Sequence, residues 1–192
     1  DDNTVVVFTS DNGGERFSDN WPFTGMKSEL LEGGLRVPMI VRWPGLSRPG
    51  STSDVPVLSM DILPTFVAAA GGAPHPDFPS DGVEWRPALA GTALPDRPLF
   101  WRFGQRQQKA LRIGRHKYLS IDENEFLFDV IADPLERANL KQREPEVFRK
   151  LKADYAAWNG TMLNDPTARS YGFSPEQLPD HFNSPEVTRK AS

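Results

Sequence analysis

The sequence of 192 residues contains no cysteine. This absence excludes disulfide bonds, thiolate metal sites and cysteine nucleophiles, and it leaves the cellular compartment undetermined. No apolar run approaches the roughly 20 residues that a membrane-spanning helix needs, so we expect no membrane partner. Charge of one sign is not in large excess either. The 22 Lys and Arg residues against 26 Asp and Glu residues give a net charge of −4, which argues against a nucleic-acid partner.

Loop-forming residues are abundant, with 18 prolines and 15 glycines, but 38% hydrophobic and 25% charged residues still indicate a globular chain. The chain opens on Asp1-Asp2-Asn3 and passes at once into the apolar run Val5-Val6-Val7-Phe8, without an initiating Met or a signal sequence. A strand of buried type this close to the start predicts a piece of a longer protein.

The first half of the sequence, residues 1–95, has the pattern of an α/β layer. Its β-branched and aromatic opening run is typical of a strand buried on both faces, as in a parallel sheet covered by helices. Gly33-Gly34 is a helix-stop signal, and Asp61 suits an N-cap. The expected elements are strands at 4–9 and 37–43, helices at 24–32 and 59–70, and a helical turn near residues 87–89.

The second half changes pattern and predicts a separate α+β subdomain over residues 96–160. Four short strands with tight spacing indicate an antiparallel meander, with a hairpin turn at Gly114-Arg115. The strands are expected at 98–103, 109–113, 117–121 and 125–130. A helix over residues 146–158 has apolar residues on one face and should pack on that sheet. Residues 161–192 are expected to form an extended, proline-rich tail.

The most informative polar residues are Asp11 and Asn12, which follow the first strand directly. Open α/β sheets place their ligands at the carboxyl ends of strands. A carboxylate and an amide carbonyl are hard oxygen donors suited to Ca²⁺ or Mg²⁺. An ordinary Asx turn is the competing interpretation. Lys27 lies in a segment that returns toward the same sheet, where its ammonium could bind a tetrahedral anion; a solvated lysine is the alternative.

Several motifs occur in an order that resembles the C-terminal half of the sulfatase family, over roughly residues 3–160. The segments are VVFTSDNGG at 6–14, GMK at 25–27, EGGLRVP at 32–38, WPG at 43–45, DILPT at 61–65, LFD at 127–129 and DPLERANL at 133–140. The resemblance implies part of an alkaline-phosphatase-like sheet-and-helix core plus a C-terminal α+β subdomain with a four-stranded antiparallel sheet and a packing helix.

The same resemblance implies sulfuric ester hydrolysis, in which a formylglycine nucleophile works beside a divalent cation, usually Ca²⁺. By position, Asp11 and Asn12 match two of the family's metal ligands. Lys27 matches the lysine that contacts the sulfate group and supports the leaving oxygen. A cation and an ammonium aimed at that oxygen would stabilise the charge that develops on it.

The nucleophile is missing from this sequence. The nearest echo of the family's Cys/Ser-x-Pro-x-Arg motif is Ser47-Arg48-Pro49-Gly50-Ser51, which has serine where arginine is required. We therefore expect half of a metal and sulfate site, completed by a missing N-terminal half. The chain alone is predicted to be inactive, and its unpaired flank predicts self-association.

Two other functions stay open. A phosphomonoester or phosphonate hydrolase of the same superfamily is the first, although those enzymes more often place Asp-His where this chain has Asp11-Asn12. A non-catalytic interaction module is the second. Trp101, Arg102 and Arg106 lie in a basic, aromatic stretch and are weak candidates for substrate binding. The first interpretation of that stretch is a solvated face on which neighbouring strands pair opposite charges.

Overall fold

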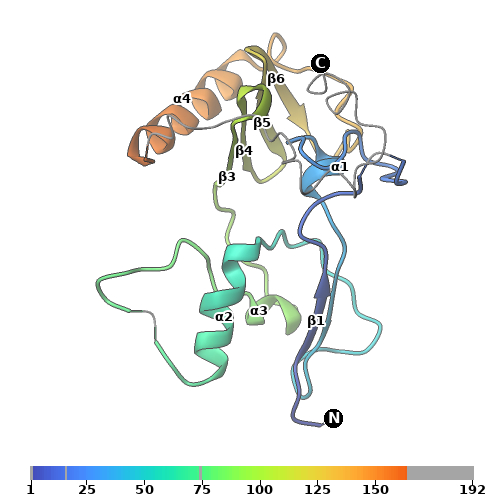
Figure 1. Ribbon diagram of the computed structural model, residues 1–192, viewed down its shortest axis with the longest axis vertical. Helices are drawn as coiled ribbons and strands as arrows, with labels where there is room; N and C mark the ends of the chain where they lie inside the picture. Colours follow the sequence, from blue (N-terminus) through green and yellow to red (C-terminus); the bar gives the residue numbers. More distant parts are fainter. Residues whose placement is uncertain (1, 16, 74, 164–192) are drawn as a thin grey trace, which may run out of the picture.

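The computed structural model describes residues 2–15, 17–73 and 75–163, and most of the expected C-terminal tail lies outside these residues. Figure 1 shows two lobes joined by extended segments. The lower lobe contains β1 (Val6–Thr9), β2 (Met39–Arg42), α2 (Ile62–Ala69) and α3 (Arg86–Leu89). The upper lobe contains α1 (Glu32–Leu35), β3 (Leu99–Phe103), β4 (Gln108–Ile113), β5 (His116–Ile121), β6 (Asn124–Asp129) and α4 (Pro145–Thr161).

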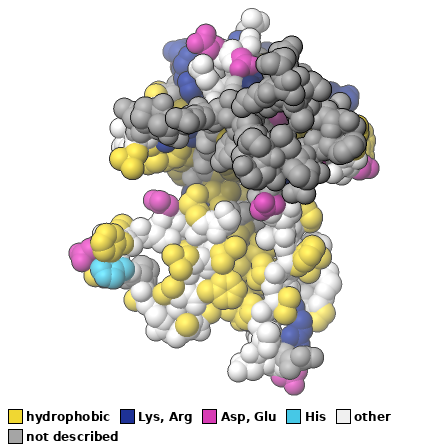
Figure 2. Space-filling view, viewed as in Figure 1, with side chains coloured by type: hydrophobic (Ala, Val, Ile, Leu, Met, Phe, Trp, Pro, Cys, Tyr) yellow, Lys and Arg dark blue, Asp and Glu magenta, His cyan; other side chains and the backbone are white. Residues whose placement is uncertain are grey.

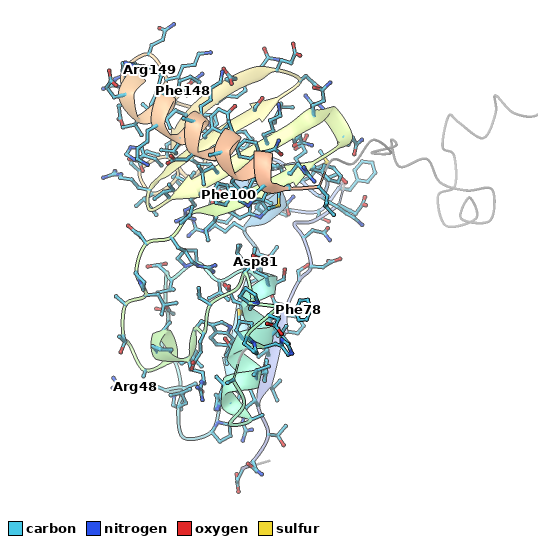
Figure 3. All side chains as sticks on the ribbon, turned by 90° about the vertical axis from the view of Figure 1, so that its left-hand side faces the viewer. Arg48, Phe78, Asp81, Phe100, Phe148 and Arg149 are labelled. Atoms are coloured by element: carbon cyan, nitrogen blue, oxygen red, sulfur yellow. The ribbon has the colours of Figure 1, made fainter. Side chains whose placement is uncertain are left out.

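The upper-lobe sheet confirms the predicted meander, because its strands are antiparallel in the order β3-β4-β5-β6. Its two faces are covered by different parts of the chain. On one face, Leu111 and Tyr118 pack against Leu151 and Tyr155 of α4. Phe100 adds a ring stacked on Trp158 with centroids 4.6 Å apart, at the helix–sheet interface seen in Figure 3. Each large apolar side chain buried there stabilises the fold by about 1.5–3 kcal/mol.

The opposite face of this sheet is covered by residues from the first half of the chain. Leu30 forms one buried cluster with Ala110, Leu119, Phe128 and Val130. Alternation along β4 and β5 explains this division, since neighbouring residues of a strand point to opposite faces. The C-terminal sheet is therefore the surface on which the segment before α1 folds.

The predicted helix over residues 24–32 is wrong. Residues 24–31 are not helical, and the short helix α1 begins at Glu32 and includes Gly33 and Gly34. The buried amide of Gln108 explains the difference, because its Oε1 accepts from the backbone N–H of Leu30 at 2.9 Å. Tertiary hydrogen bonds thus replace the local helical ladder.

The opening strand is present, but its expected parallel, doubly buried environment is not. β1 pairs antiparallel with β2 in a two-stranded ribbon, with Val6 opposite Arg42 and Thr9 opposite Met39. One face of this ribbon is open, because the paired residues Phe8 and Ile40 are each 65% exposed, whereas the apolar residues of the other face are half-buried. Hydrophobic side chains gather on the lower lobe in Figure 2.

The lower lobe has a small core built around aromatic rings and one buried carboxylate. The Trp43 ring stacks on Phe66 and meets Trp85 edge-on, with centroid distances of 5.7 and 6.2 Å. Asp61 precedes α2, as predicted, but its carboxylate does not cap the helix. It accepts from the backbone N–H groups of Leu58 at 2.7 Å and Val83 at 2.9 Å, and it pairs with Arg97.

None of the helices in the described part of the chain is long and apolar enough to cross a membrane.

Candidate functional site

The loop that follows β1 forms one wall of a cavity of about 290 Å³. Asn12 lines this cavity and is partly buried, whereas Asp11 is exposed and is not among the lining residues. The lining residues are Ser10, Asn12, Gly13, Gly14, Asp19, Asn20, Trp21, Phe23, Gly33, Arg36, Val37 and Pro38. The cavity therefore lies at the carboxyl end of β1, where the sequence predicts a ligand.

Asn20 ties the two halves of this site together. Its Oδ1 accepts from the backbone N–H of Gly14 at 2.9 Å, and its Nδ2 donates to the carbonyl of Gly25 at 3.0 Å. Through Asn20, the two bonds together link the loop after β1 to the segment that carries Lys27. Asn20 is not predictable from the sequence, because a single asparagine in an irregular stretch carries no periodic or motif signal.

Lys27 is placed beside the Asp11-Asn12 loop by its backbone. Its N–H donates to the carbonyl of Gly14 at 2.9 Å. Its side chain is 46% exposed and pairs with Glu15, with Nζ 3.2 Å from Oε1. Lys27 does not line the cavity beside Asn12. The structure thus brings the two segments together, while the ammonium is held at an exposed carboxylate.

Glycine is required where α1 meets the loop. The N–H of Gly13 donates to the carbonyl of Gly34 at 2.9 Å. A Cβ atom on Gly13 would lie 1.8 Å from the carbonyl oxygen of Gly33, which no side chain can tolerate. Gly25 has a φ of +94°, a conformation that favours glycine. The motif glycines therefore permit close backbone packing around the cavity.

The donor set of this site suits a hard cation but is incomplete within the described residues. Asp11 offers a carboxylate and Asn12 an amide carbonyl, both of which Ca²⁺ accepts as ligands. No group of three or more His, Cys, Asp or Glu side chains in residues 2–15, 17–73 and 75–163 could hold a metal. Two oxygen donors fit a divalent cation only as part of a shell of six to eight.

The three weaker substrate candidates do not reach the cavity. Trp101 packs against the Leu30 cluster on the sheet. Arg102 donates to the carbonyl of Leu163 at 3.0 Å and to Asn159 Oδ1 at 3.3 Å. Arg106 donates to Asp122 Oδ2 at 2.8 Å, and this hydrogen bond raises the pKa of the arginine. Arg106 lies in a 3-10 turn, Gln105–Gln107, and Asp122 lies in the turn after β5, so this pair does not test the predicted pairing of charges between neighbouring strands.

A buried charge cluster lies behind the site and was not predicted. Nζ of Lys117 lies 2.9 Å from Oε1 of Glu32 and 2.9 Å from Oε1 of Glu136. The Lys117 and Glu136 side chains have no exposed surface, and that of Glu32 is 4% exposed. Burial raises the pKa of Glu136, and Lys117 opposes that rise. Lysine at position 117 is typical of the solvent-exposed face of a strand, so the sequence alone gave no signal that its side chain is buried.

Comparison with known proteins agrees with this geometry. The family model described as Sulfatase matches residues 1–73. The chain is 38% identical over 122 residues to N-acetylgalactosamine-6-sulfatase of Canis lupus familiaris, and 32% identical over 163 residues to arylsulfatase A of Homo sapiens. The chain belongs to the sulfatase family. Of the two relatives' own lengths it spans 23% and 32%, and the matches cover 60% and 79% of the chain.

A solved structure confirms the fold of this sulfatase chain. The crystal structure of Ps i-CgsB superimposes with a TM-score of 0.75 at 30% sequence identity, covering 82% of this chain and 36% of that one. The alkaline-phosphatase-like fold and the antiparallel C-terminal sheet expected from the motifs are therefore correct.

Proposed function

We propose that this chain supplies half of the metal and sulfate site of a sulfatase, an enzyme that hydrolyses sulfuric ester bonds. Asp11 and Asn12 are the proposed ligands of a divalent cation, and Lys27 is the proposed sulfate-binding catalytic residue. The observation that carries this is the hydrogen bond from the Lys27 amide to the carbonyl of Gly14, 2.9 Å long. It joins the two motif segments that the family uses at one site.

The chemistry assigned to each residue follows from its charge. Cleavage of a sulfate ester moves negative charge onto the bridging oxygen, and a fixed ammonium at Lys27 would stabilise that charge. A bound divalent cation, most consistent with Ca²⁺ for an Asp and Asn pair, would supply Lewis-acid stabilisation of the sulfate oxygens. To reach a substrate, the Lys27 ammonium must leave Glu15, which costs little because both side chains are exposed.

The proposal predicts weak cation binding by the chain alone. With two side-chain ligands, calorimetry should give a Ca²⁺ dissociation constant of about 10⁻⁴ M or weaker. Asp11→Asn should weaken it further, whereas Asp54→Asn, at an exposed residue of the lower lobe, should not. Sub-micromolar binding would contradict a half-site, and binding unaffected by Asp11→Asn would contradict the ligand assignment.

The chain alone should show no turnover of an aryl sulfate, because the sequence holds neither cysteine nor a complete Cys/Ser-x-Pro-x-Arg motif. Turnover by this polypeptide, with contaminants excluded, would overturn the assignment of the nucleophile to another segment. We propose that the N-terminal half of the same protein is the partner that supplies it.

The exposed apolar side chains of the lower lobe support this partnership. Val6, Phe8 and Ile40 are 49%, 65% and 65% exposed, and Leu63 of α2 is 66% exposed. Exposed apolar area of this kind marks an interaction surface or an aggregation liability. We expect the isolated chain to self-associate, and a monodisperse monomer in sedimentation velocity would count against this proposal.

Asn12 favours a sulfatase over a phosphonate hydrolase of the same superfamily, since imidazole rather than amide ligands suit Zn²⁺ or Mn²⁺. An interaction module without catalysis predicts that no Cys/Ser-x-Pro-x-Arg motif precedes Asp1 in the gene. Sequencing upstream of Asp1 distinguishes the enzyme from the module directly.

A further inference from the structure

The segment that carries Lys27, residues 24–32, is held in place by the C-terminal sheet. It contains no regular secondary structure before Glu32. Gln108, the first residue of β4, is 1% exposed and faces the middle of this segment. Its Oε1 accepts from the N–H of Leu30 at 2.9 Å, and its Nε2 donates to the carbonyl of Ser28 at 2.8 Å. One buried amide therefore fixes two backbone groups immediately after Lys27.

The two ends of the 24–32 segment are held by neighbouring residues of the DPLERANL motif. Oγ1 of Thr24 donates to the carbonyl of Leu135 at 2.6 Å. The N–H of Glu32 donates to Oε2 of Glu136, also at 2.6 Å. Lys117 then holds Glu136 and Glu32 together, with Nζ 2.9 Å from a carboxylate oxygen of each.

These contacts surround Lys27 without touching its ammonium. The acceptors and donors that fix the segment come from β4 and from the loop after β6, which lie about 80 to 110 positions later in the chain. An irregular segment has no internal ladder to define its shape, so external hydrogen bonds decide it. Loss of the bond at Leu30 or at Glu32 would leave a buried backbone N–H group unpaired.

We propose that Gln108 and Glu136 are positioning residues for Lys27. They act through the backbone of the 24–32 segment, and they make the C-terminal sheet a template for the sulfate-binding lysine. The inference rests on the proposed function only for the role of Lys27 at the sulfate. The template itself requires only that Gln108 and Glu136 set the conformation of the segment.

Hydrogen exchange measured by NMR on the chain tests the template. The readouts are the amides of Lys27 and Gly33, which donate to Gly14 and Thr24 and so keep their own acceptors in every variant. Gln108→Met and Glu136→Met should raise their exchange rates about tenfold, as expected when a buried hydrogen bond that closes the segment is lost. The amide of Leu119 in β5 should change much less.

The matched control is Lys109→Met, which changes the next residue of β4 at an exposed position. It should leave exchange at Lys27 and Gly33 unchanged. Equal acceleration at Lys27 and Leu119 in the Gln108 variant would show a general loss of stability and overturn the proposal. So would unchanged exchange at Lys27 in both methionine variants.

A conservative variant separates positioning from charge. Glu136→Gln keeps an oxygen acceptor for the N–H of Glu32, and it should restore slow exchange at Lys27 that Glu136→Met abolishes. The NMR chemical shift of the Lys27 ammonium should also differ from that of the parent chain in the methionine variants, and it should match the parent chain in the glutamine variant. None of these readouts requires cation binding or turnover, so failure of the proposed function would leave them unaffected.

Discussion

Nζ of Lys117 lies 2.9 Å from Oε1 of Glu32, in a position where the lysine side chain has no contact with solvent. The two residues are separated by 85 positions in the sequence. Glu136 supplies a second carboxylate at the same distance, so one ammonium is shared by two acids. Two flanking arginines, Arg36 and Arg112, approach Glu32 Oε2 at 3.9 and 4.0 Å and offset the excess negative charge.

Lys117→Met should lower the free energy of unfolding by about 3–5 kcal/mol, because it leaves two carboxylates buried without their cation. Urea denaturation followed by tryptophan fluorescence measures this change. The exposed Lys109, also on the sheet, provides the control, and Lys109→Met should stay within about 0.5 kcal/mol of the parent chain. A Lys117 variant as stable as the Lys109 variant would show that the buried pairs contribute nothing net.

Gly34→Ala should destabilise the chain by about 1–3 kcal/mol or more, as expected for overpacking. A Cβ atom at Gly34 would lie 2.0 Å from the carbonyl oxygen of Glu29 and 2.5 Å from that of Met26. Backbone atoms cannot move aside as a flexible side chain can. The midpoint of thermal unfolding of Gly34→Ala, compared with that of the parent chain, measures the effect.

Gly160→Ala is the matched substitution for that experiment, because nothing lies within 4 Å of a Cβ at Gly160. It belongs to α4, where alanine is favoured over glycine by up to about 1 kcal/mol. An unchanged or raised midpoint is expected. If Gly34→Ala behaves in the same way, the close packing of α1 on the 24–32 segment is wrong.

The sequence predicted those elements whose pattern is local. The four strands of the meander and α4 follow from alternation and helical spacing, and they match the structure within a few residues at each end. The strand end carrying Asp11 and Asn12 was also predictable, because an apolar run followed by an Asx-Gly turn marks such an end. Local signals are reliable where an element's own side chains determine its burial.

The segment before α1 could not be predicted in this way. Its leucines at 30, 31 and 35 have helical spacing, but the hydrogen bonds that decide its shape come from Gln108, Leu135 and Glu136. Tertiary contacts there override the local pattern. The antiparallel pairing of β1 with β2 was equally unpredictable, since a strand's own sequence does not specify which strand pairs with it.

The ion pair between Arg115 and Asp129 should make stability fall in acid. Nε of Arg115 donates to Asp129 Oδ2 at 2.7 Å, and this hydrogen bond holds the pKa of Asp129 below its usual value of 3.8. Because the pKa of Asp129 is lower in the folded chain than in the unfolded chain, its ionised form stabilises the fold at pH values above the unfolded-state pKa. That stabilisation is lost as the pH falls through the folded-state pKa. Stability should therefore decline below about pH 4.

Asp129→Asn should remove that part of the acid dependence, while the amide oxygen can still accept from the N–H groups of Ile131 and Ala132. The measurement is urea denaturation at a series of pH values between neutral and strongly acidic. Parallel curves for parent and variant across this range would show that Asp129 does not contribute through ionisation.

On the proposed function, Lys27→Ala should separate catalysis from stability when the chain is tested together with the proposed N-terminal half. The ion pair of Lys27 with Glu15 joins two side chains that are 46% and 64% exposed, so its loss should cost at most about 1 kcal/mol of folding stability. Turnover of a sulfate ester should fall by about 10²-fold or more, as expected when one preorganised charge aimed at the leaving oxygen is removed. Glu15→Ala breaks the same pair but leaves the ammonium in place, so turnover should be retained. If both variants lose stability and activity together, Lys27 serves the fold, and its backbone bond to Gly14 is then its contribution to the site.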